Sequence, residues 1–537
     1  MLRRKLCQLI VGIWFLLTFL LTVYYTYRIN VSSKGPRISK SSWECSGTGR
    51  SRVCIVRNFC VDKYSGGFVA VDTALEQSQA ESDLNINLIN ADQEGDAYYK
   101  PEAKLRQSLP ASSATYYNET LFVYGLYAPD HYSHMLFNGL TPLYRTIHAF
   151  NKTKDDVWTY RAITSQRSSS KKPLMTTEFF SNHPDIVRDR LDLTSDQQML
   201  LPKEPMCFSE AVIGAGNACS MSFYCEKPIE ASTYTALRDD AVEYYVTQGN
   251  WRRQSDHAMH QDSGRDDLAC VENMETVSQN TGKPKRVVAL INRTPRTWTN
   301  ILEFRQALLD QRSDYDYTIK TFSFDGGCSV ASSVYLTHDV DILITPHGSQ
   351  EGAALFMKDK TTVISVDARG YSEDWFAYPF IAMGRRFYTL QCQKKSCVEI
   401  DIGLANDIFG GTFVPSGEEV RECISWVNDV SPEQCILNYL PDTKNGHAHD
   451  VSSSYSKNVP RKADIPKLLK LVNETMTEQD MFRDLSYKDI CDQEKCCGFN
   501  CKYALETVMY GSQLNGRMRA WSKPGDPIEE SKEDWIV

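Results

Sequence analysis

The sequence predicts an α/β fold with a largely parallel sheet, placed behind an N-terminal membrane helix. Strand-like and helix-like segments alternate between residues 286 and 366, which is the order found in α/β sheets. The strand at 286–291 (Arg-Val-Val-Ala-Leu-Ile) is a continuous apolar run, as expected of a parallel strand covered on both faces. A second apolar run, from residue 6 to about residue 25, supplies the membrane segment.

The remaining elements follow from the spacing of apolar residues. Further segments have the pattern of a strand or a helix: strands at 120–124, 317–322, 341–345 and 361–366, and helices at 132–150, 300–309 and 330–337. Polar segments at 166–172 and 441–460 are expected to be loops. Residues 29–115 lack sustained periodicity, and we expect them to form a stem between the membrane and the folded domain.

The N-terminal run has the length and flanks of an uncleaved signal-anchor. About 20 helical residues cross a hydrocarbon core of ~30 Å, and Arg3, Arg4 and Lys5 favour a cytoplasmic N-terminus. A cleaved signal peptide is the alternative, but Tyr25 and Arg28 resemble an interfacial belt more than a cleavage site. Residues 1–28 are therefore expected to be a cytoplasmic tip and a type II membrane helix, with the rest of the chain lumenal.

Cysteines and glycosylation tripeptides agree with a lumenal location. The chain has 17 cysteines, and all but Cys7 follow the apolar run, which leaves an even 16 for disulfides. The C-terminal group could instead be a zinc site, but its adjacent cysteines and the oxidising compartment favour disulfides: Cys491, Cys496, Cys497 and Cys501. Asn-x-Ser/Thr tripeptides give weaker support: they begin at Asn30, Asn118, Asn151, Asn292 and Asn473. Golgi or endoplasmic reticulum membrane is the expected location.

The charge pattern excludes one class of partner. The net charge is −9, and no block of lysine and arginine occurs outside the N-terminus. A nucleic-acid-binding protein normally carries a basic patch or stripe. We therefore expect no nucleic-acid partner.

An arginine pair follows the apolar strand directly. Arg293 and Arg296 lie between the end of that strand and the helix expected at 300–309. Guanidinium groups bind phosphate bidentately, and ligands gather at the carboxyl ends of parallel strands. The pair is predicted to bind an anion such as a diphosphate, although two surface arginines on a loop are the simpler alternative.

A Pro-His-Gly-Ser segment ends the strand at 341–345. Gly348 allows close approach of a ligand to the backbone, and Ser349 with the following amides can face a phosphate or a ribose. His347 is a candidate hydrogen-bond donor to a leaving diphosphate. The alternative is that His347 only satisfies neighbouring carbonyl groups.

A third segment contains a candidate base. On the helix expected at 132–150, His134 and Asn138 are four residues apart and share one face. Histidine has a suitable pKa to take the proton of a sugar hydroxyl. A structural histidine is the alternative.

The order of these three segments resembles glycosyltransferase family 61, which includes β-1,2-xylosyltransferases and lumenal O-linked N-acetylglucosaminyltransferases. The resemblance covers about residues 116–395 and rests on matched positions: His134, Asn138, Pro142 and Tyr144; Arg293, Arg296 and Asn300; His347, Gly348, Ser349, Leu355 and Phe356. It implies a GT-B-like fold with two Rossmann-like halves and a donor cleft between them. The halves are expected at 116–280 on the acceptor side and 281–440 on the nucleotide-sugar side, followed by a cysteine-containing extension at 441–537.

The resemblance also implies a function. An inverting transferase would move N-acetylglucosamine or xylose from a UDP-sugar to a glycan or glycoprotein. Arg293, Arg296, Asn300, His347, Gly348 and Ser349 would bind the donor, and Asn138 would lie on the acceptor side.

Two departures from the family pattern leave alternatives open. Asn138 stands where the family has aspartate, and Gln350, Glu351, Gly352 and Ala353 replace Gly-Leu-Thr-Asn. The catalytic base is therefore His134 or Glu351. The rival hypothesis is a catalytically inactive, lumenal glycan-binding relative.

Two Asp-x-Asp patterns raise the question of a metal. They lie at 314–316 and 339–341, next to expected strand starts, and suit turns better than metal binding. Because the arginines could neutralise a diphosphate, we expect no metal and no other cofactor.

Overall fold

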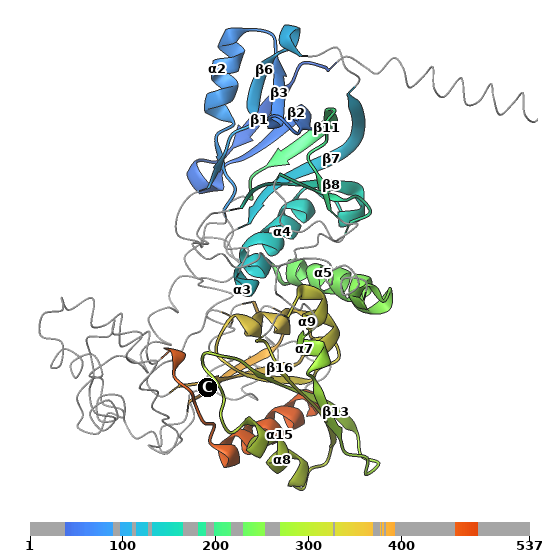
Figure 1. Ribbon diagram of the computed structural model, residues 1–537, viewed down its shortest axis with the longest axis vertical. Coiled ribbons are helices and arrows are strands. Elements are labelled where there is room, and N and C mark those ends of the chain that lie inside the picture. The colour runs from blue at the N-terminus through green and yellow to red at the C-terminus, as the bar shows by residue number, and fades with distance from the viewer. Residues whose placement is uncertain are drawn as a thin grey trace, which may run out of the picture.

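The structure is a computed structural model in which two sheets are joined through a layer of helices (Figure 1). It describes residues 38–89, 97–109, 114–126, 131–164, 181–188, 198–215, 229–252, 269–325, 328–368, 376, 379–380, 383–391 and 457–481. The expected membrane helix at 1–28 and the cysteines at 491–501 lie outside these residues. Within the described part of the chain, no helix is both long and apolar enough to cross a membrane.

The N-terminal sheet is mixed. Its strands run in the order β10-β9-β8-β7-β11-β2-β3-β6, and β1 pairs with β2. The strands from β10 to β11 are parallel, whereas β2 is antiparallel to both β11 and β3. Their bounds are β1 Ser42–Ser46, β2 Val53–Asp62, β3 Gly66–Val71, β6 Glu102–Leu105, β7 Thr115–Leu126, β8 Val157–Thr164, β9 Asp185–Val187, β10 Gln198–Leu200 and β11 Met206–Ile213. A separate short pair consists of β4 Ile86–Asn87 and β5 Tyr98–Tyr99.

The stem expected at 29–115 is wrong for much of its length. Strands β1 to β3 and β6 belong to the sheet, and helix α2 (Ala74–Asp83) packs beside β3 and β6. The Cys60–Cys207 disulfide joins β2 to β11, and Cys45–Cys54 joins β1 to β2. Strand β2 pairs with β11, about 150 residues later in the chain, so local periodicity could not reveal it.

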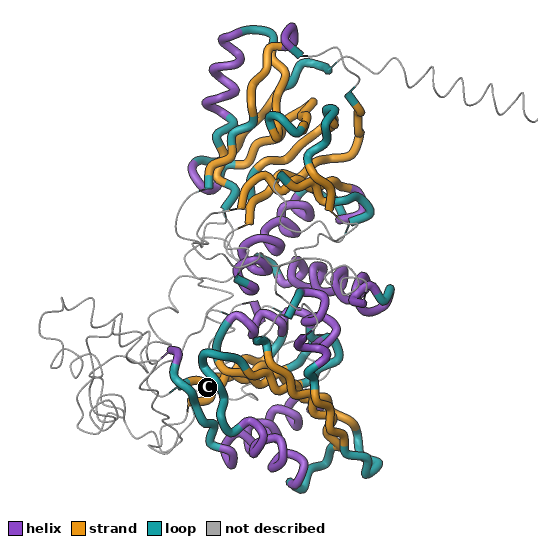
Figure 2. Tube along the Cα trace, in the orientation of Figure 1, coloured by secondary structure: helices purple, strands orange, loops and turns teal. Residues whose placement is uncertain are grey.

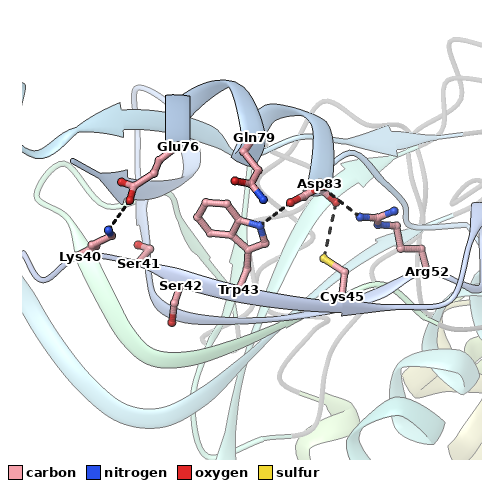
Figure 3. A pocket seen from close by; sticks show the side chains of 9 residues that line it. All are labelled: Lys40, Ser41, Ser42, Trp43, Cys45, Arg52, Glu76, Gln79 and Asp83. Atoms are coloured by element: carbon pink, nitrogen blue, oxygen red, sulfur yellow. Dashed lines mark hydrogen bonds and ion pairs between the residues drawn. The ribbon is translucent and has the colours of Figure 1, made fainter. Parts of the chain in front are cut away.

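A groove lies between β1 and α2 (Figure 3). Trp43 reaches across it, and the indole Nε1 donates to Asp83 Oδ2 at 3.0 Å. Lys40 pairs with Glu76, and Arg52 lies 3.9 Å from Asp83. These contacts fasten α2 to the first strand of the sheet.

The C-terminal sheet is a parallel sheet with one antiparallel edge strand. Its order is β12-β14-β13-β15-β16-β17, and only β12 runs antiparallel to its neighbour. The strands are β12 Glu275–Ser278, β13 Lys285–Asn292, β14 Asp316–Ser323, β15 Ile342–Pro346, β16 Thr362–Asp367 and β17 Arg386–Gln391. The helices joining them include α8 Ile301–Asp310 and α9 Val330–Thr337. The predicted order of strands and helices is confirmed from β13 to β16, whereas the edge strands β12 and β17 were not predicted.

Helices cover both faces of the C-terminal sheet, because its strands are apolar on both sides. Val288 and Leu290 of β13 pack with α8 and with α15 (Ile465–Met481) on one face. Ala289 and Ile291 pack on the other face with α9 and with η7, a 3-10 helix at Ser349–Phe356. Residues 457–481, assigned by sequence to a C-terminal extension, thus belong to this half of the molecule.

The two halves share one hydrophobic core. The segment predicted as a helix at 132–150 forms α3 Tyr132–Met135, a π-helical turn at Leu136–Leu140 and α4 Thr141–Ala149. Together with α5 (Ala231–Val242), it lies between the sheets and packs in one cluster with β7, β13, α9 and η7 (Figures 1 and 2). The short α7 (Ala269–Glu272) is joined to the loop before α9 by the Cys270–Cys328 disulfide.

A buried ion pair joins two neighbouring strands of the N-terminal sheet. Arg161 on β8 donates to Asp185 on β9 at 2.6 Å, and both side chains are almost fully buried. Tyr124 and Thr159 also donate to the Asp185 carboxylate, each at 2.9 Å. The carboxylate therefore balances a guanidinium that has lost its water.

We predict that Asp185→Asn lowers the free energy of unfolding by about 3–5 kcal/mol, because it leaves the Arg161 charge buried without its counterion. Urea unfolding followed by circular dichroism measures the change. The control is Glu474→Gln in the exposed Lys470–Glu474 pair, where a change below about 1 kcal/mol is expected. A small effect of Asp185→Asn would show that the pair does not stabilise the sheet.

Candidate active site

The predicted site residues meet at the topological switch point of the C-terminal sheet. Strand β13 connects through α8 to β14 on one side, and β15 connects through η7 to β16 on the other side. The two connections therefore diverge at the carboxyl ends of β13 and β15. Ligands of open α/β sheets bind beyond the carboxyl ends of the strands at such a point. Arg293 follows β13, and His347 follows β15, at the same edge of the sheet.

The loop of residues 293–298, here called the arginine loop, is held from inside by Asn292. The Asn292 Oδ1 accepts hydrogen bonds from the backbone N–H groups of Arg293 and Trp298, both at 2.9 Å. The Asn292 Nδ2 donates to the Trp298 carbonyl at 3.2 Å. The Trp298 side chain is fully buried in the core beneath the loop. One amide side chain thus fixes both ends of the arginine loop.

Neutral oxygen atoms hold the two guanidinium groups. Arg293 donates to Gln350 Oε1 at 2.7 Å, and Arg296 donates to the His347 carbonyl at 3.0 Å. Desolvation and the nearby charge of Arg296 lower the pKa of Arg293 to about 10, so Arg293 remains a cation at pH 7. Because neither bond supplies a negative charge, the arrangement is suited to an incoming anion.

Gly348 lies directly against both guanidinium groups. Its φ is +153°, and a Cβ at this position would lie 2.1 Å from an Arg293 terminal nitrogen and 3.1 Å from one of Arg296. Any larger residue would push the arginines away. The close approach that the sequence predicted for Gly348 is thus made by two side chains of the protein.

His347 and Glu351 are buried behind the arginines. His347 is 2% exposed, and its Nδ1 lies 3.5 Å from Glu351 Oε1. Glu351 is fully buried, accepts a hydrogen bond from Ser365 at 2.8 Å, and has its pKa raised by desolvation. A carboxylate with no exposed surface cannot meet an acceptor from solvent. The structure therefore gives no support to Glu351 as a catalytic base and makes it a neighbour that orients His347.

The start of α3 brings the third predicted segment to the same place. Ser133 Oγ donates to the Ser349 carbonyl at 2.6 Å, joining the N-terminal half to η7. His134 is partly exposed, and its Nδ1 lies 2.8 Å from Oδ1 of the buried Asn138. Because an amide oxygen only accepts, Nδ1 carries the proton and Nε2 keeps its lone pair. Asn138 thus acts on the site through His134 and does not itself reach the surface.

The charges of the two arginines affect the pKa of His131, which precedes α3. Desolvation by surrounding groups lowers the pKa of His131, and the charges of His134, Arg293, Arg296 and Lys457 lower it further. The rings of His131 and His134 lie 4.4 Å apart. The charges of the arginine loop therefore act on the histidine that precedes α3.

Residues 457–463, here called the C-terminal strap, run along the arginine loop. Arg296 donates its backbone N–H to the Asn458 carbonyl and its Nε to Asn458 Oδ1, both at 3.2 Å. Trp298 and Arg461 form a parallel bridge flanked by two further backbone hydrogen bonds. No sequence pattern signals this contact, because about 160 residues separate its two sides.

Asn300 has a structural role in the same contact. It is buried; its Oδ1 accepts from Trp298 Nε1 and the Ala463 N–H, and its Nδ2 donates to the Ala463 carbonyl. All of these partners are protein groups. Asn300 supports the predicted donor site by fixing the strap, and the contacts do not favour direct binding of a donor.

The Asp-x-Asp residues serve strand starts, as predicted. Asp316 accepts hydrogen bonds from the loop before β13, and Asp341 accepts from the Val287 N–H and pairs with Lys358. In the described residues, no cluster of three or more His, Cys, Asp or Glu side chains could hold a metal ion.

The structure thus brings most of the predicted residues together and adds others. Arg293, Arg296, His347, Gly348 and Ser349 share one edge with His134. Sequence reasoning missed the supporting roles of Asn292, Gln350, Asn458 and Arg461. Gln350 was recognisable only as a departure from the family pattern, and its fully buried amide joins Arg293 to the end of β15.

Comparison with known proteins agrees with the site. Residues 132–364 match the family model described as Glycosyltransferase 61. The match begins at α3 and ends within β16, so it includes all the site residues predicted from the sequence. It confirms the resemblance found from the sequence motifs. No curated protein matches the chain.

We predict that Asn292→Ala lowers the free energy of unfolding by roughly 1–3 kcal/mol, because the substitution leaves the buried Trp298 N–H without its acceptor. Asn292→Asp is the matched control, since a carboxylate keeps both acceptor bonds and loses only the donor bond. Thermal unfolding of the two variants measures the difference. Equal midpoints for Asn292→Ala and the unmodified protein would show that the Asn292 hydrogen bonds do not stabilise the arginine loop.

Proposed function

Because residues 132–364 belong to glycosyltransferase family 61, we propose that the chain is an inverting glycosyltransferase using a UDP-sugar donor. Its acceptor is a hydroxyl group of a glycan or glycoprotein. The donor sugar is N-acetylglucosamine or xylose, as in the members that the sequence resembles. The family supports glycosyltransferase activity in general.

The arginine pair is the observation that carries the proposal. Arg293 and Arg296 lie beyond the carboxyl end of β13 at the switch point, held by the neutral oxygens of Gln350 and His347. A nucleotide diphosphate has the charge and the oxygen atoms that two adjacent guanidinium groups bind best. With two cations at this position, the diphosphate needs no metal ion to balance its charge, so metal-independent transfer is part of the proposal.

His134 is the proposed catalytic base. Its Nε2 lone pair is fixed by the Nδ1 contact with Asn138, and its ring is on the half of the molecule opposite the arginines. In a single displacement, Nε2 takes the proton of the acceptor hydroxyl while the oxygen attacks the anomeric carbon. The bond from that carbon to the diphosphate breaks, and the leaving diphosphate takes the electron pair. Attack opposite the leaving group inverts the anomeric centre.

His347 and Glu351 are proposed to position the donor side. The His347 carbonyl accepts a hydrogen bond from Arg296, and the His347 ring lies close to Glu351. His347 thus links the guanidinium group to the buried carboxylate. Burial holds the ring in one orientation.

We also propose that the chain is a type II membrane protein of the Golgi or endoplasmic reticulum, with this site in the lumen.

We predict that the full-length chain binds UDP in chelator with a micromolar Kd and GDP at least tenfold more weakly. The double variant Arg293→Ala, Arg296→Ala is expected to lose UDP binding, because it removes both cations from the switch point. Calorimetry measures both affinities and, with UDP-N-acetylglucosamine and UDP-xylose, identifies the donor. Arg305→Ala on the outer side of α8 is the control and should bind UDP normally. A folded protein without UDP affinity would favour the non-catalytic glycan-binding alternative.

We predict that His134→Ala lowers kcat by about 10²–10⁴-fold and leaves the Kd for UDP within about twofold. The reason is that the imidazole takes the acceptor proton but does not contact the donor. Product formation from the donor identified above measures kcat, and calorimetry measures the Kd. Asn138→Asp keeps an acceptor for Nδ1–H and is expected to retain activity. Unchanged turnover of His134→Ala would exclude this histidine as the base.

A further inference from the structure

The C-terminal strap lies outside the part of the chain that matches the family model. The match ends at residue 364, and the strap begins at residue 457. Yet the strap pairs with the arginine loop along its length: Arg296 bonds to Asn458, Thr299 donates to the Arg461 carbonyl, and Arg461 donates to the Thr297 carbonyl. Helix α15 anchors the strap by packing on the core beneath α8. The strap is therefore a fixed wall of the site.

The strap adds positive charge to a place that already holds two arginines. Charges of Lys457, Arg293 and Arg296 all act on His131. Desolvation lowers the pKa of Arg461 to about 10, and its charged neighbours are Asp367, Arg296, Arg293 and Glu351. Four cationic side chains thus converge near two buried carboxylates, Glu351 and Asp367. An anion bound here would balance the excess of positive charge.

The two strap cations have different surroundings. Arg461 is 1% exposed, and its guanidinium donates to the carbonyl groups of Lys457, Val459 and Val366. These bonds fasten the strap to the end of β16 and fix the backbone of Lys457. Lys457 itself is only partly buried and directly precedes Asn458, whose carbonyl accepts the backbone N–H of Arg296. Arg461 is thus suited to positioning, and Lys457 to contact with a ligand.

We propose that the strap completes the diphosphate site, with Lys457 as a third cationic ligand of the donor diphosphate and Arg461 as the residue that positions it. This inference rests on the proposed function, because the anion is the diphosphate of the UDP-sugar. It extends the donor site to a segment about 160 residues from the arginine loop. It also gives a reason for the backbone pairing of residues 457–463 with the arginine loop.

The test compares two substitutions of Lys457 in the full-length chain, with UDP as the probe. Lys457→Met keeps the length of the side chain and removes its charge, so the Kd for UDP is expected to rise at least tenfold. Lys457→Arg keeps the charge and is expected to bind UDP within about threefold of the unmodified protein. Lys470→Met, on the exposed side of α15, is the matched control and should leave the Kd unchanged.

Each outcome of the titration decides the inference. Weak binding by Lys457→Met together with normal binding by Lys457→Arg supports it. Normal UDP binding by both variants overturns the role of Lys457 and leaves the proposed function standing. Equal loss of binding by both variants also overturns it, because the positive charge would then not be what matters. Absence of UDP binding by the unmodified protein overturns the proposed function and this inference together.

Discussion

The site depends on keeping two like charges together at the edge of a hydrophobic core. Arg293 and Arg296 repel each other and are partly withdrawn from water, which lowers the pKa of Arg293. A carboxylate bonded to each would stabilise them but would also fill the place of a bound anion. The fold instead uses the neutral oxygens of Gln350 and His347, with Asn292 fixing the backbone between them. A bound anion would relieve the repulsion that remains between the two arginines, and this relief would favour its binding.

The packing around the arginine loop holds the two like charges together. Trp298 is buried under the arginine loop, and the strap closes the loop from outside. On the opposite face of the sheet, η7 packs against α3, so the residues after His347 are in contact with the N-terminal half. The candidate base and the residues after His347 are therefore placed by one shared hydrophobic cluster. A shift of α3 relative to η7 would change the distance between them.

Much of the C-terminal half was predictable because its elements are local and strongly apolar. Strand β13 and helix α9 were found at nearly their observed bounds, and the residues at the ends of β13 and β15 meet as expected. In the N-terminal sheet only the strand at 120–124 was predicted, and it lies within β7. The other strands were missed because several are half-exposed and β2 finds its partner in β11 far along the chain. The burial of Glu351 was equally hidden, since sequence shows a carboxylate but not the Ser365 hydroxyl and the core that enclose it.

Asn292 also begins an acceptor tripeptide for N-linked glycans, Asn292-Arg-Thr. A glycan would be joined to Nδ2, the atom that donates to the Trp298 carbonyl in the folded protein. One hydrogen of that amide nitrogen is used by the Trp298 carbonyl, and a glycan would replace the other. A glycan attached to Asn292 would therefore place a bulky polar group beside the arginine loop.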